Sequence, residues 1–315
     1  MNSFEKILYL LQIQMERPKP YDWFHWMWIG LVVVSLIALF VLRKKYSNKQ
    51  LKIVLGVYGI VALILEVTKQ IMWSFDYDVS NNLVTWDYQW YAAPFQLCTT
   101  PIFASIICLF LKEGKVRESI LSYMAFVTIL GSFMTILIPD SCFTKDILIN
   151  VHTMWLHCGS FVVSIYLLIS GAIKVNKENF KNGFKVFLIF VLIAEILNIG
   201  IYNFGILNGE TFNMFYISPY FISTLPVFNV LQENLPFILY YIMILAYHIF
   251  KINTSLFVSN LCINIYTFTF INFKYSSRLC CIINSISDFC YFASSISCFT
   301  LNQFAPPYLF NVFHD

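Results

Sequence analysis

The chain has 315 residues, of which 59% are hydrophobic and only 12% are charged, and its formal net charge is +3. About a quarter of the residues in a soluble globular domain are charged, so this composition excludes an ordinary soluble protein. The small positive charge requires no acidic partner, and neither a nucleic-acid partner nor a soluble protein partner is expected. The mean hydropathy of +0.70 instead predicts an integral membrane protein.

Seven apolar stretches follow one another along the chain. Each has about 20 residues, the length that a helix needs to cross a hydrocarbon core of about 30 Å. We predict membrane-spanning helices near Trp26–Leu42, Leu51–Trp73, Ala92–Leu111, Ser119–Ile138, Ile147–Gly171, Phe184–Tyr202 and Leu231–Phe250. The predicted fold class is therefore all-α, with residues 1–252 forming a seven-helix domain that crosses the cell membrane several times.

Lysine and arginine are distributed unevenly between the connections. They cluster after the first, third, fifth and seventh stretches, at Arg43, Lys44, Lys45, Lys112, Lys115, Arg117, Lys174, Lys177, Lys181, Lys185 and Lys251. The other connections carry mainly Asp and Glu, with Lys145 as their only cation. Short cytoplasmic loops retain Lys and Arg, so the N-terminus is predicted outside and the C-terminus inside, although Lys6, Arg17 and Lys19 count against this orientation.

Two segments lie outside the predicted spans. Phe4–Met15 contains Glu5 and Lys6 and is short, so we expect an amphipathic helix at the membrane interface rather than a cleavable signal. Residues 253–315 are rich in Ser, Phe, Ile and Asn and hold most of the cysteines, without the spacing of a zinc site. We predict a low-complexity tail there, disordered or loosely associated with the membrane, because three asparagines make Thr254–Phe273 a poor eighth span.

Polar side chains within the predicted spans mark candidate functional positions, because they are expensive inside a bilayer. They are Glu66, Lys69 and Gln70 in the second span, Gln96 and Cys98 in the third, His152 and His157 in the fifth, and Glu195 and Asn198 in the sixth. At a rise of about 1.5 Å per residue, Glu66, Cys98 and His157 each lie roughly 10–15 Å below the outer boundary. We therefore predict a shared polar cavity that opens toward the outer leaflet.

Each of these positions also has a purely structural interpretation. Glu66 and Lys69 are three residues apart and would form an ion pair on one helix face. Cys98 would be a small buried hydrophobe, as is usual for a membrane cysteine. His152 lies near the predicted interface, where water would satisfy it. Because His152 and His157 are separated by about 140° around a helix, they are not expected to hold a metal ion.

A cysteine and a histidine at matched depth on neighbouring helices are the minimum that covalent acyl transfer requires. The thiolate is the nucleophile, and an adjacent imidazole removes its proton and returns it to the leaving group. Gln96, Asn198 or Asn203 would donate hydrogen bonds to the oxyanion. Cysteine and histidine are common residues, so the pairing of Cys98 with His157 is a weak signal when it rests on spacing alone.

Short motifs occur in order along the predicted helices. They are Leu65-Glu66, Pro94-Phe95-Gln96-Leu97-Cys98, Ile138-Pro139-Asp140, His152 with His157, Asn213-Met214-Phe215, and Ser223, Leu225 and Pro236. In these motifs His25–Phe250 resembles the YwaF-type integral membrane family, whose eukaryotic relatives are acyltransferases that move fatty acyl chains between phospholipids. The resemblance implies that Cys98 is the nucleophile and that His157 is the histidine of the fifth span. The chain departs from the family at Phe95-Gln96 and over Pro219–Val230, which puts the substrate in question more than the architecture.

From this resemblance we predict lipid acyl transfer, in which Cys98 accepts a chain from a membrane phospholipid and His157 acts first as base and then as acid. Glu66 or Glu195 would orient the imidazole. No metal or other cofactor is expected, since the chain has no glycine-rich phosphate loop or dinucleotide motif. Two other functions stay open: binding or transport of a solute or proton through Glu66, Lys69, His157 and Glu195, and a non-catalytic scaffold whose polar groups only hold helices together.

The predicted orientation can be tested by labelling single cysteines in intact cells, in a background from which the native cysteines have been removed. Lys115→Cys should be protected from a membrane-impermeant maleimide, because position 115 belongs to a predicted cytoplasmic cluster. Asp78→Cys should react, because position 78 lies in a connection that is predicted outside. Labelling of position 115 from the outside would contradict the orientation.

Overall fold

Helices make up most of the chain that the computed structural model describes, namely residues 2–42, 47–81, 83–139, 142–223, 228–236 and 239–240. These residues belong to one unit, Met1–Leu261. The predicted tail after Asn253 lies outside the described residues. Most of the seventh predicted span, Leu231–Phe250, lies outside them as well, and only its beginning is seen, at α9 (Phe228–Asn234).

Within the described residues, five segments are long and apolar enough to cross a membrane. They are α2 (Trp23–Leu42), α3 (Asn48–Met72), α5 (Lys115–Phe126) together with α6 (Thr128–Leu137), α7 (Ile147–Ile169) and α8 (Lys177–Asn203). They correspond to the first, second, fourth, fifth and sixth predicted spans, with ends that differ by a few residues. The count of seven spans and the orientation of the termini stay predictions.

The third predicted span, Ala92–Leu111, differs from the structure in its first half. The short 3-10 helix η1 (Trp90–Ala92) is followed by an irregular segment, and α4 (Thr100–Phe110) begins eight residues later than predicted. Pro94 has no N–H to donate and disfavours a helical conformation in the residue before it. Pro101 lies in the first turn of α4, where a proline is tolerated. Cys98 therefore lies in a turn just before a helix and not within one.

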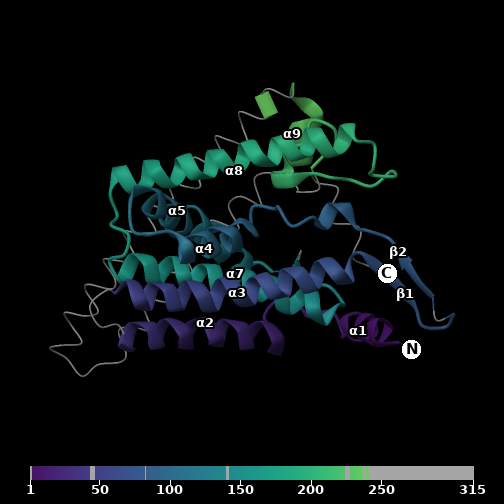
Figure 1. The fold of residues 1–315 in the computed structure, drawn as a ribbon, viewed down its shortest axis with the longest axis horizontal. Helices are drawn as coiled ribbons and strands as arrows, with labels where there is room; N and C mark the ends of the chain where they lie inside the picture. The colour runs from purple at the N-terminus through teal and green to yellow at the C-terminus, as the bar shows by residue number, and fades with distance from the viewer. Residues whose placement is uncertain are drawn as a thin grey trace, which may run out of the picture. The chain divides into compact units, whose positions relative to one another are not determined.

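Helix α7 is at the centre of the bundle and is in contact with α2, α3, α5 and α6. Figure 1 shows α2, α3 and α8 running lengthwise, with α4 and α5 between α3 and α8. The contacts agree with this view, because α3 packs against α4, α4 against α5, and α5 against α8. Side chains on nearly every face of α7 are therefore directed at a neighbouring helix.

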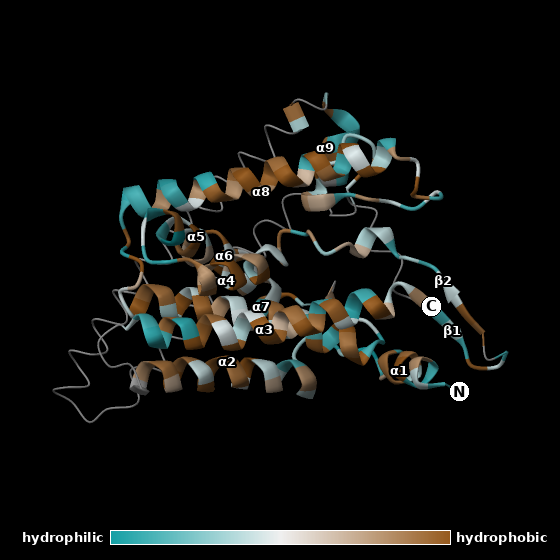
Figure 2. Cartoon of the chain, in the orientation of Figure 1, coloured by the Kyte–Doolittle hydropathy of each residue, from teal (hydrophilic) through white to brown (hydrophobic). Residues whose placement is uncertain are grey.

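Large apolar side chains cover the outer faces of α2, α3 and α8. The exposed ones include Leu31, Val34, Ile37, Ile53, Val57, Ile60, Ile64, Ile189, Leu192 and Ile196. Figure 2 shows hydrophobic residues along the length of these helices, and hydrophilic residues at both ends of α3 and at the start of α8. A soluble monomer rarely exposes so extensive an apolar surface, whereas the hydrocarbon of a bilayer accommodates it, so these faces are suited to contact lipid.

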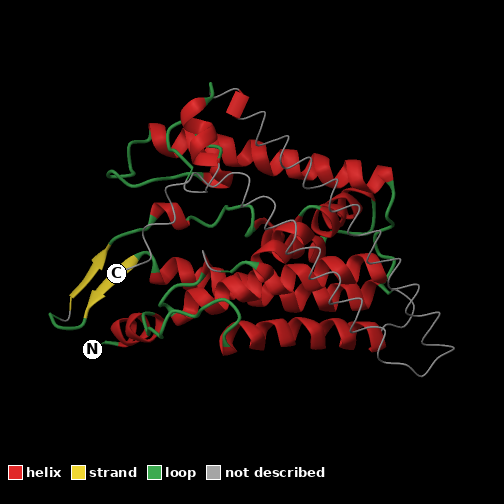
Figure 3. Cartoon of the chain, turned by 180° about the vertical axis from the view of Figure 1, so that it is seen from behind, coloured by secondary structure: helices red, strands yellow, loops and turns green. Residues whose placement is uncertain are grey.

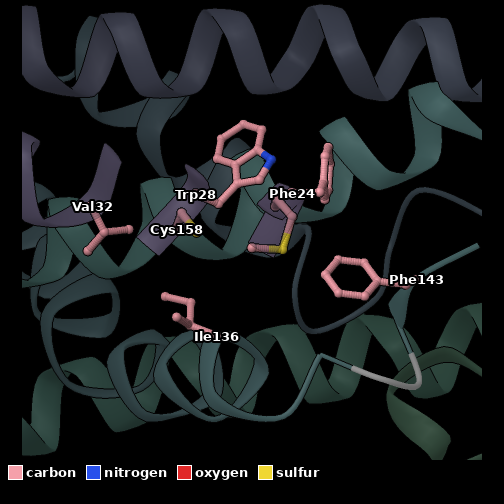
Figure 4. Packing of buried hydrophobic residues seen from close by; sticks show 7 residues of the cluster. Phe24, Trp28, Val32, Ile136, Phe143 and Cys158 are labelled. Atoms are coloured by element: carbon pink, nitrogen blue, oxygen red, sulfur yellow. The ribbon is translucent and has the colours of Figure 1, made fainter. Parts of the chain in front are cut away.

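An apolar cluster joins α2 to α6 and α7. It consists of Phe24, Trp28 and Val32 from α2, Ile136 from α6, Met154 and Cys158 from α7, and Phe143 from the connection before α7. The rings of Phe24 and Phe143 meet edge to face, with centroids 5.9 Å apart (Figure 4). This arrangement is one that aromatic pairs favour, and it fixes the first half of α2 against the centre of the bundle.

Two small elements lie together at one end of the bundle (Figure 3). They are α1 (Ser3–Leu11) and an antiparallel hairpin of β1 (Phe75–Asp78) and β2 (Leu83–Trp86). Helix α1 matches the expected N-terminal helix and begins with a capping box formed by Asn2 and Glu5. The Gln12 side chain donates a hydrogen bond to the Phe75 carbonyl at 3.2 Å, which ties the end of α1 to the hairpin.

Gly183 allows α8 to approach α5 closely. A Cβ atom built at this position would lie 2.8 Å from the carbonyl carbon of Ser122 and 2.8 Å from the amide nitrogen of Tyr123. These are backbone atoms, so they cannot turn aside as the end of a flexible side chain can. Small residues commonly permit such close contacts between membrane helices, and this contact holds α8 against the rest of the bundle.

Gly183→Ala should push α5 and α8 apart and lower the free energy of unfolding by about 1–3 kcal/mol, the usual cost of overpacking. Gly200→Ala is the matched control on the same helix, because a Cβ at Gly200 would meet nothing within 4 Å. The control should be neutral or stabilising by up to about 1 kcal/mol through helix propensity. Thermal unfolding in detergent measures both variants, and equal changes would contradict the close contact.

Candidate functional site

A cluster of buried charges connects α3 to α7. The ammonium group of Lys69 lies 2.8 Å from Glu66 Oε1, and His152 Nε2 lies 2.7 Å from Glu66 Oε2. The exposed fractions of Glu66, Lys69 and His152 are 3%, 8% and 5%. The predicted ion pair between Glu66 and Lys69 is thus confirmed. The expectation that water satisfies His152 is wrong, because this imidazole is buried and bonded to a carboxylate.

Gln70 extends this cluster to the segment that follows the hairpin. Its side-chain amide donates hydrogen bonds to Glu66 Oε1 at 2.8 Å and to the Ala92 carbonyl at 2.9 Å. Its carbonyl oxygen accepts a hydrogen bond from the Tyr88 hydroxyl at 2.8 Å. Burial raises the pKa of the Tyr88 phenol, and the charge of Glu66 acts in the same direction, so the hydroxyl keeps its proton and donates it. Tyr88 was missed in the sequence, where nothing distinguishes it from the surrounding aromatic residues.

Cys98 lies in the same region of the bundle as the charged cluster. It is half-buried, in the turn two residues before α4 begins. Its thiol is within electrostatic range of Lys69 and Glu66 on α3 and of Cys142 before α7. Tyr58, Tyr123 and Tyr216 are also within electrostatic range of Cys98. The structure therefore brings Cys98, Glu66 and Lys69, which lie far apart in the sequence, to one region.

The side-chain amides of Gln96 and Asn198 hold the backbone of η3 (Met214–Tyr216). Gln96 donates to the Asn213 carbonyl at 3.2 Å and accepts from the Phe215 amide at 3.1 Å. Asn198 donates to the Met214 carbonyl at 3.1 Å and accepts from the Met214 amide at 2.7 Å. Phe215 has a φ of 59°, an unusual backbone conformation for a bulky residue, which these bonds help to maintain.

These bonds change the expectation for the oxyanion donors. The Gln96 and Asn198 amides already donate to backbone carbonyls, and the Asn203 amide donates to the Ile199 carbonyl at 2.7 Å. Each side-chain amide has two N–H donors, and at least one of them is already used on the backbone, so at most one N–H of each is left for an oxyanion. We therefore interpret the three side chains as parts of the scaffold and not as a ready oxyanion hole.

His157 is half-buried on α7, and the rotation of the helix indicates the side on which it lies. It is seven residues before Ser164, so the two residues share one face of the helix. The Ser164 hydroxyl lies 2.7 Å from the Met124 carbonyl on α5. The face of α7 that carries His157 is therefore directed toward α5, whereas the face that carries His152 is directed toward Glu66 on α3.

Glu195 occupies a different part of the bundle. It lies on α8, and its Oε2 is buried with no hydrogen-bond partner among the described residues. The observed partners of the other candidate carboxylate, Glu66, are Lys69, Gln70 and His152. The carboxylate that orients a histidine in this structure is thus Glu66, and the histidine is His152.

Comparison with known proteins identifies one family. The model of the TMEM164 family matches residues 20–250, which cover most of the chain and both α3 and α7. No curated protein and no solved structure matches the chain significantly. The match supports a TMEM164-type family of membrane proteins, while the YwaF-type family and its relation to acyltransferases stay predictions.

Removing one charge of the buried ion pair should destabilise the protein strongly. In Glu66→Gln the ammonium of Lys69 stays buried without a counter-ion, and we expect a loss of about 3–5 kcal/mol in the free energy of unfolding. The double variant Glu66→Gln/Lys69→Met removes both charges and should recover much of this loss. A double-mutant cycle of unfolding in detergent measures the coupling. Additive effects of the two substitutions would show that the charges do not stabilise one another.

Proposed function

Because the chain belongs to the TMEM164 family, we propose that it is a membrane-embedded enzyme that moves a fatty acyl chain between lipids through a thioester on Cys98. One observation carries this proposal: Cys98 is within electrostatic range of Glu66 and Lys69, which form a buried cluster with His152. A charged cluster is expensive inside a bilayer and commonly marks a functional site. The site belongs to a protein that we place in the cell membrane, with phospholipids as its substrates.

The position of Cys98 suits a nucleophile better than the structural alternative. Cys108 and Cys158 are almost fully buried among helices, as expected of cysteines that only fill space. Cys98 instead lies half-buried in an irregular turn, close to ionisable groups. Among the described cysteines, this combination of partial exposure and a neighbouring cation, Lys69, favours Cys98 as the reactive thiol.

The proposed reaction has two similar halves. The Cys98 sulfur attacks the ester carbonyl carbon of a phospholipid while the thiol proton passes to His157. When the tetrahedral intermediate collapses, the carbon–oxygen bond breaks, and His157 returns the proton to the departing lysophospholipid oxygen. The hydroxyl group of an acceptor lipid then attacks the thioester, and its proton passes through His157 to the Cys98 sulfur.

The surrounding residues support these steps in different ways. We assign stabilisation of the oxyanion to Lys69, because its positive charge acts at Cys98, whereas the Gln96 and Asn198 amides bond the backbone of η3. Fixed positive charge near a developing oxyanion is an effective source of catalysis. Glu66 positions Lys69 and His152, and through Gln70 it also positions the segment that leads to Cys98.

The proposal predicts the activity of three single variants. Cys98→Ser should nearly abolish acyl transfer, because a hydroxyl proton is far harder to remove than a thiol proton. His157→Gln keeps hydrogen-bonding capacity but cannot carry a proton, so the rate should fall about 10²–10⁴-fold. Cys108→Ser is the matched control, because Cys108 lies eight residues into α4, roughly 12 Å from its start, and should be close to silent.

The measurement is transfer of a labelled acyl chain between phospholipids by the purified full-length chain in liposomes. The thermal stability of each variant shows whether a loss of activity reflects unfolding. Hydroxylamine-sensitive labelling of wild type but not of Cys98→Ser would identify the thioester. Activity that persists in Cys98→Ser, or its absence in the wild type, would reject the mechanism.

A further inference from the structure

A polar cavity of about 290 Å³ lies where α5 and α8 begin. Its lining comes from the first turn of α5, from the connection between α7 and α8, and from the first turns of α8. Helix α4 has 11 residues, a length of about 16 Å, and it separates Cys98 from the connection that leads to α5. The cavity is therefore a site apart from Cys98.

Charges of both signs line the cavity without pairing with one another. Lys115 and Glu118 are on α5, whereas Lys174 precedes α8 and Glu178 lies in its first turn. None of the four belongs to an ion pair within the described part of the chain, where the ion pairs seen are those of Glu66. A ligand that carries both a negative and a positive group would complement these two lysines and two glutamates.

A buried amide in the lining adds a hydrogen-bond acceptor. Asn179 is 5% exposed, its backbone N–H donates to the Asn176 side chain, and its side-chain nitrogen donates to the Lys174 carbonyl at 3.1 Å. Its side-chain oxygen has no donor among the described residues, and it does not belong to the orphaned polar atoms that are sealed from solvent. A ligand in the cavity can therefore reach this oxygen, and a positively charged group is a suitable partner for it.

The start of α5 is suited to a phosphate. Gly114 precedes this helix and has no side chain with which to cap it, so the N–H groups of the first turn have no partner within the helix. The helix dipole also favours a negative group at this end. Lys115 lies in the same turn, and with Lys174 it brings two positive charges to the lining.

The surface next to the cavity is apolar and follows one face of α8. Asn182 lines the cavity and is seven residues before Ile189, which is seven residues before Ile196, so the three residues share a face of the helix. Ile189 and Ile196 are 56% and 61% exposed. Figure 2 shows the same change along α8, which is hydrophilic at its start and hydrophobic beyond it.

The dimensions suit a lipid whose headgroup alone enters the cavity. The volume is at the lower end of the range of about 300–1,000 Å³ that is typical of small-molecule sites, so it accommodates a headgroup but not the acyl chains. Ile196 is roughly 21 Å beyond Asn182 along α8, which is more than half of a hydrocarbon core of about 30 Å. An acyl chain of one leaflet thus has apolar surface along its whole length, which a soluble ligand would not use.

We propose that this cavity binds the headgroup of a zwitterionic phospholipid, with the acyl chains along the exposed face of α8. The two lysines and the start of α5 contact the phosphate, and the two glutamates and Asn179 contact the ammonium group. The lipid is bound without reacting, at a distance from Cys98, so the proposal holds whether or not the chain is an enzyme.

The test is native mass spectrometry of the purified full-length chain in detergent, which identifies bound lipids by mass. Phosphatidylcholine and phosphatidylethanolamine should each bind roughly 2- to 10-fold more tightly than phosphatidylglycerol with the same acyl chains, because phosphatidylglycerol has the phosphate but no positive group. Equal or tighter binding of phosphatidylglycerol would overturn the proposal.

A headgroup without acyl chains separates a lipid site from a site for a soluble ligand. Glycerophosphocholine should not displace phosphatidylcholine at the same concentration, because it lacks the contact with α8. Displacement would overturn the lipid as the occupant. Cys98→Ser should bind the same lipids as the wild type does, even if its acyl transfer is lost, so the two proposals fail separately.

Removal of the carboxylates tests the contact with the ammonium group. Glu118→Gln/Glu178→Gln should erase the preference for zwitterionic lipids, since the lining then has only positive charges. Glu113→Gln is the control and should keep the preference, because Glu113 is exposed and outside the lining. A preference that survives the double substitution, in a variant with wild-type thermal stability, would contradict the assignment.

Removal of the lysines tests the contact with the phosphate. Lys115→Gln/Lys174→Gln should weaken the binding of all three phospholipids roughly 2- to 10-fold. Lys112→Gln/Lys181→Gln is the matched control, because it removes two exposed cations that do not line the cavity. Equal weakening in both variants would show a general effect of charge and would overturn the cavity as the binding site.

Discussion

The carboxylate of Glu66 is the group on which the polar interior of the bundle depends. An isolated charge is costly to bury, and Glu66 is buried among membrane-spanning helices. Its two oxygens accept hydrogen bonds from Lys69, Gln70 and His152. Lys69 neutralises the carboxylate within α3, whereas His152 joins it to α7, and Gln70 joins it to the segment at Ala92. Compensation of one charge therefore helps to position the segment that leads to Cys98.

Close packing around α7 provides the second constraint, and it comes from small residues. A Cβ at Gly159 would lie 2.6 Å from the ring of Tyr58, so only glycine lets α3 and α7 approach this closely. The hydroxyl of Ser160 lies 2.6 Å from the Tyr58 hydroxyl, and Ser164 reaches the Met124 carbonyl. Between membrane helices the hydrophobic effect gives little drive for association, so packing and interhelical hydrogen bonds of this kind hold the bundle together.

The sequence predicted the long helices well because hydrocarbon thickness sets their length, and it predicted the Glu66–Lys69 pair because one helix turn separates the two residues. Prediction from the sequence failed where contacts between distant parts of the chain determine the local structure. The hairpin at Phe75–Trp86 is held by α1 through Gln12, a contact that composition does not reveal. Helix α4 starts late because Pro94 disfavours a helical conformation. This effect of proline is predictable from the sequence, but the apolar residues around Pro94 suggested one continuous helix. Pairing of His152 with Glu66, and engagement of Gln96 by η3, depend on how helices rotate against one another, which spacing along one helix cannot give.

Tyr58 on α3 is held by several contacts with α7. Its ring packs against Gly159, and the residue is within electrostatic range of Cys98. The bond to Ser160 and the bond from Trp155 to the Tyr58 carbonyl hold the residue at both its hydroxyl and its backbone. Rotation of α7 against α3 would break both bonds, so Tyr58 helps to hold His152 opposite Glu66.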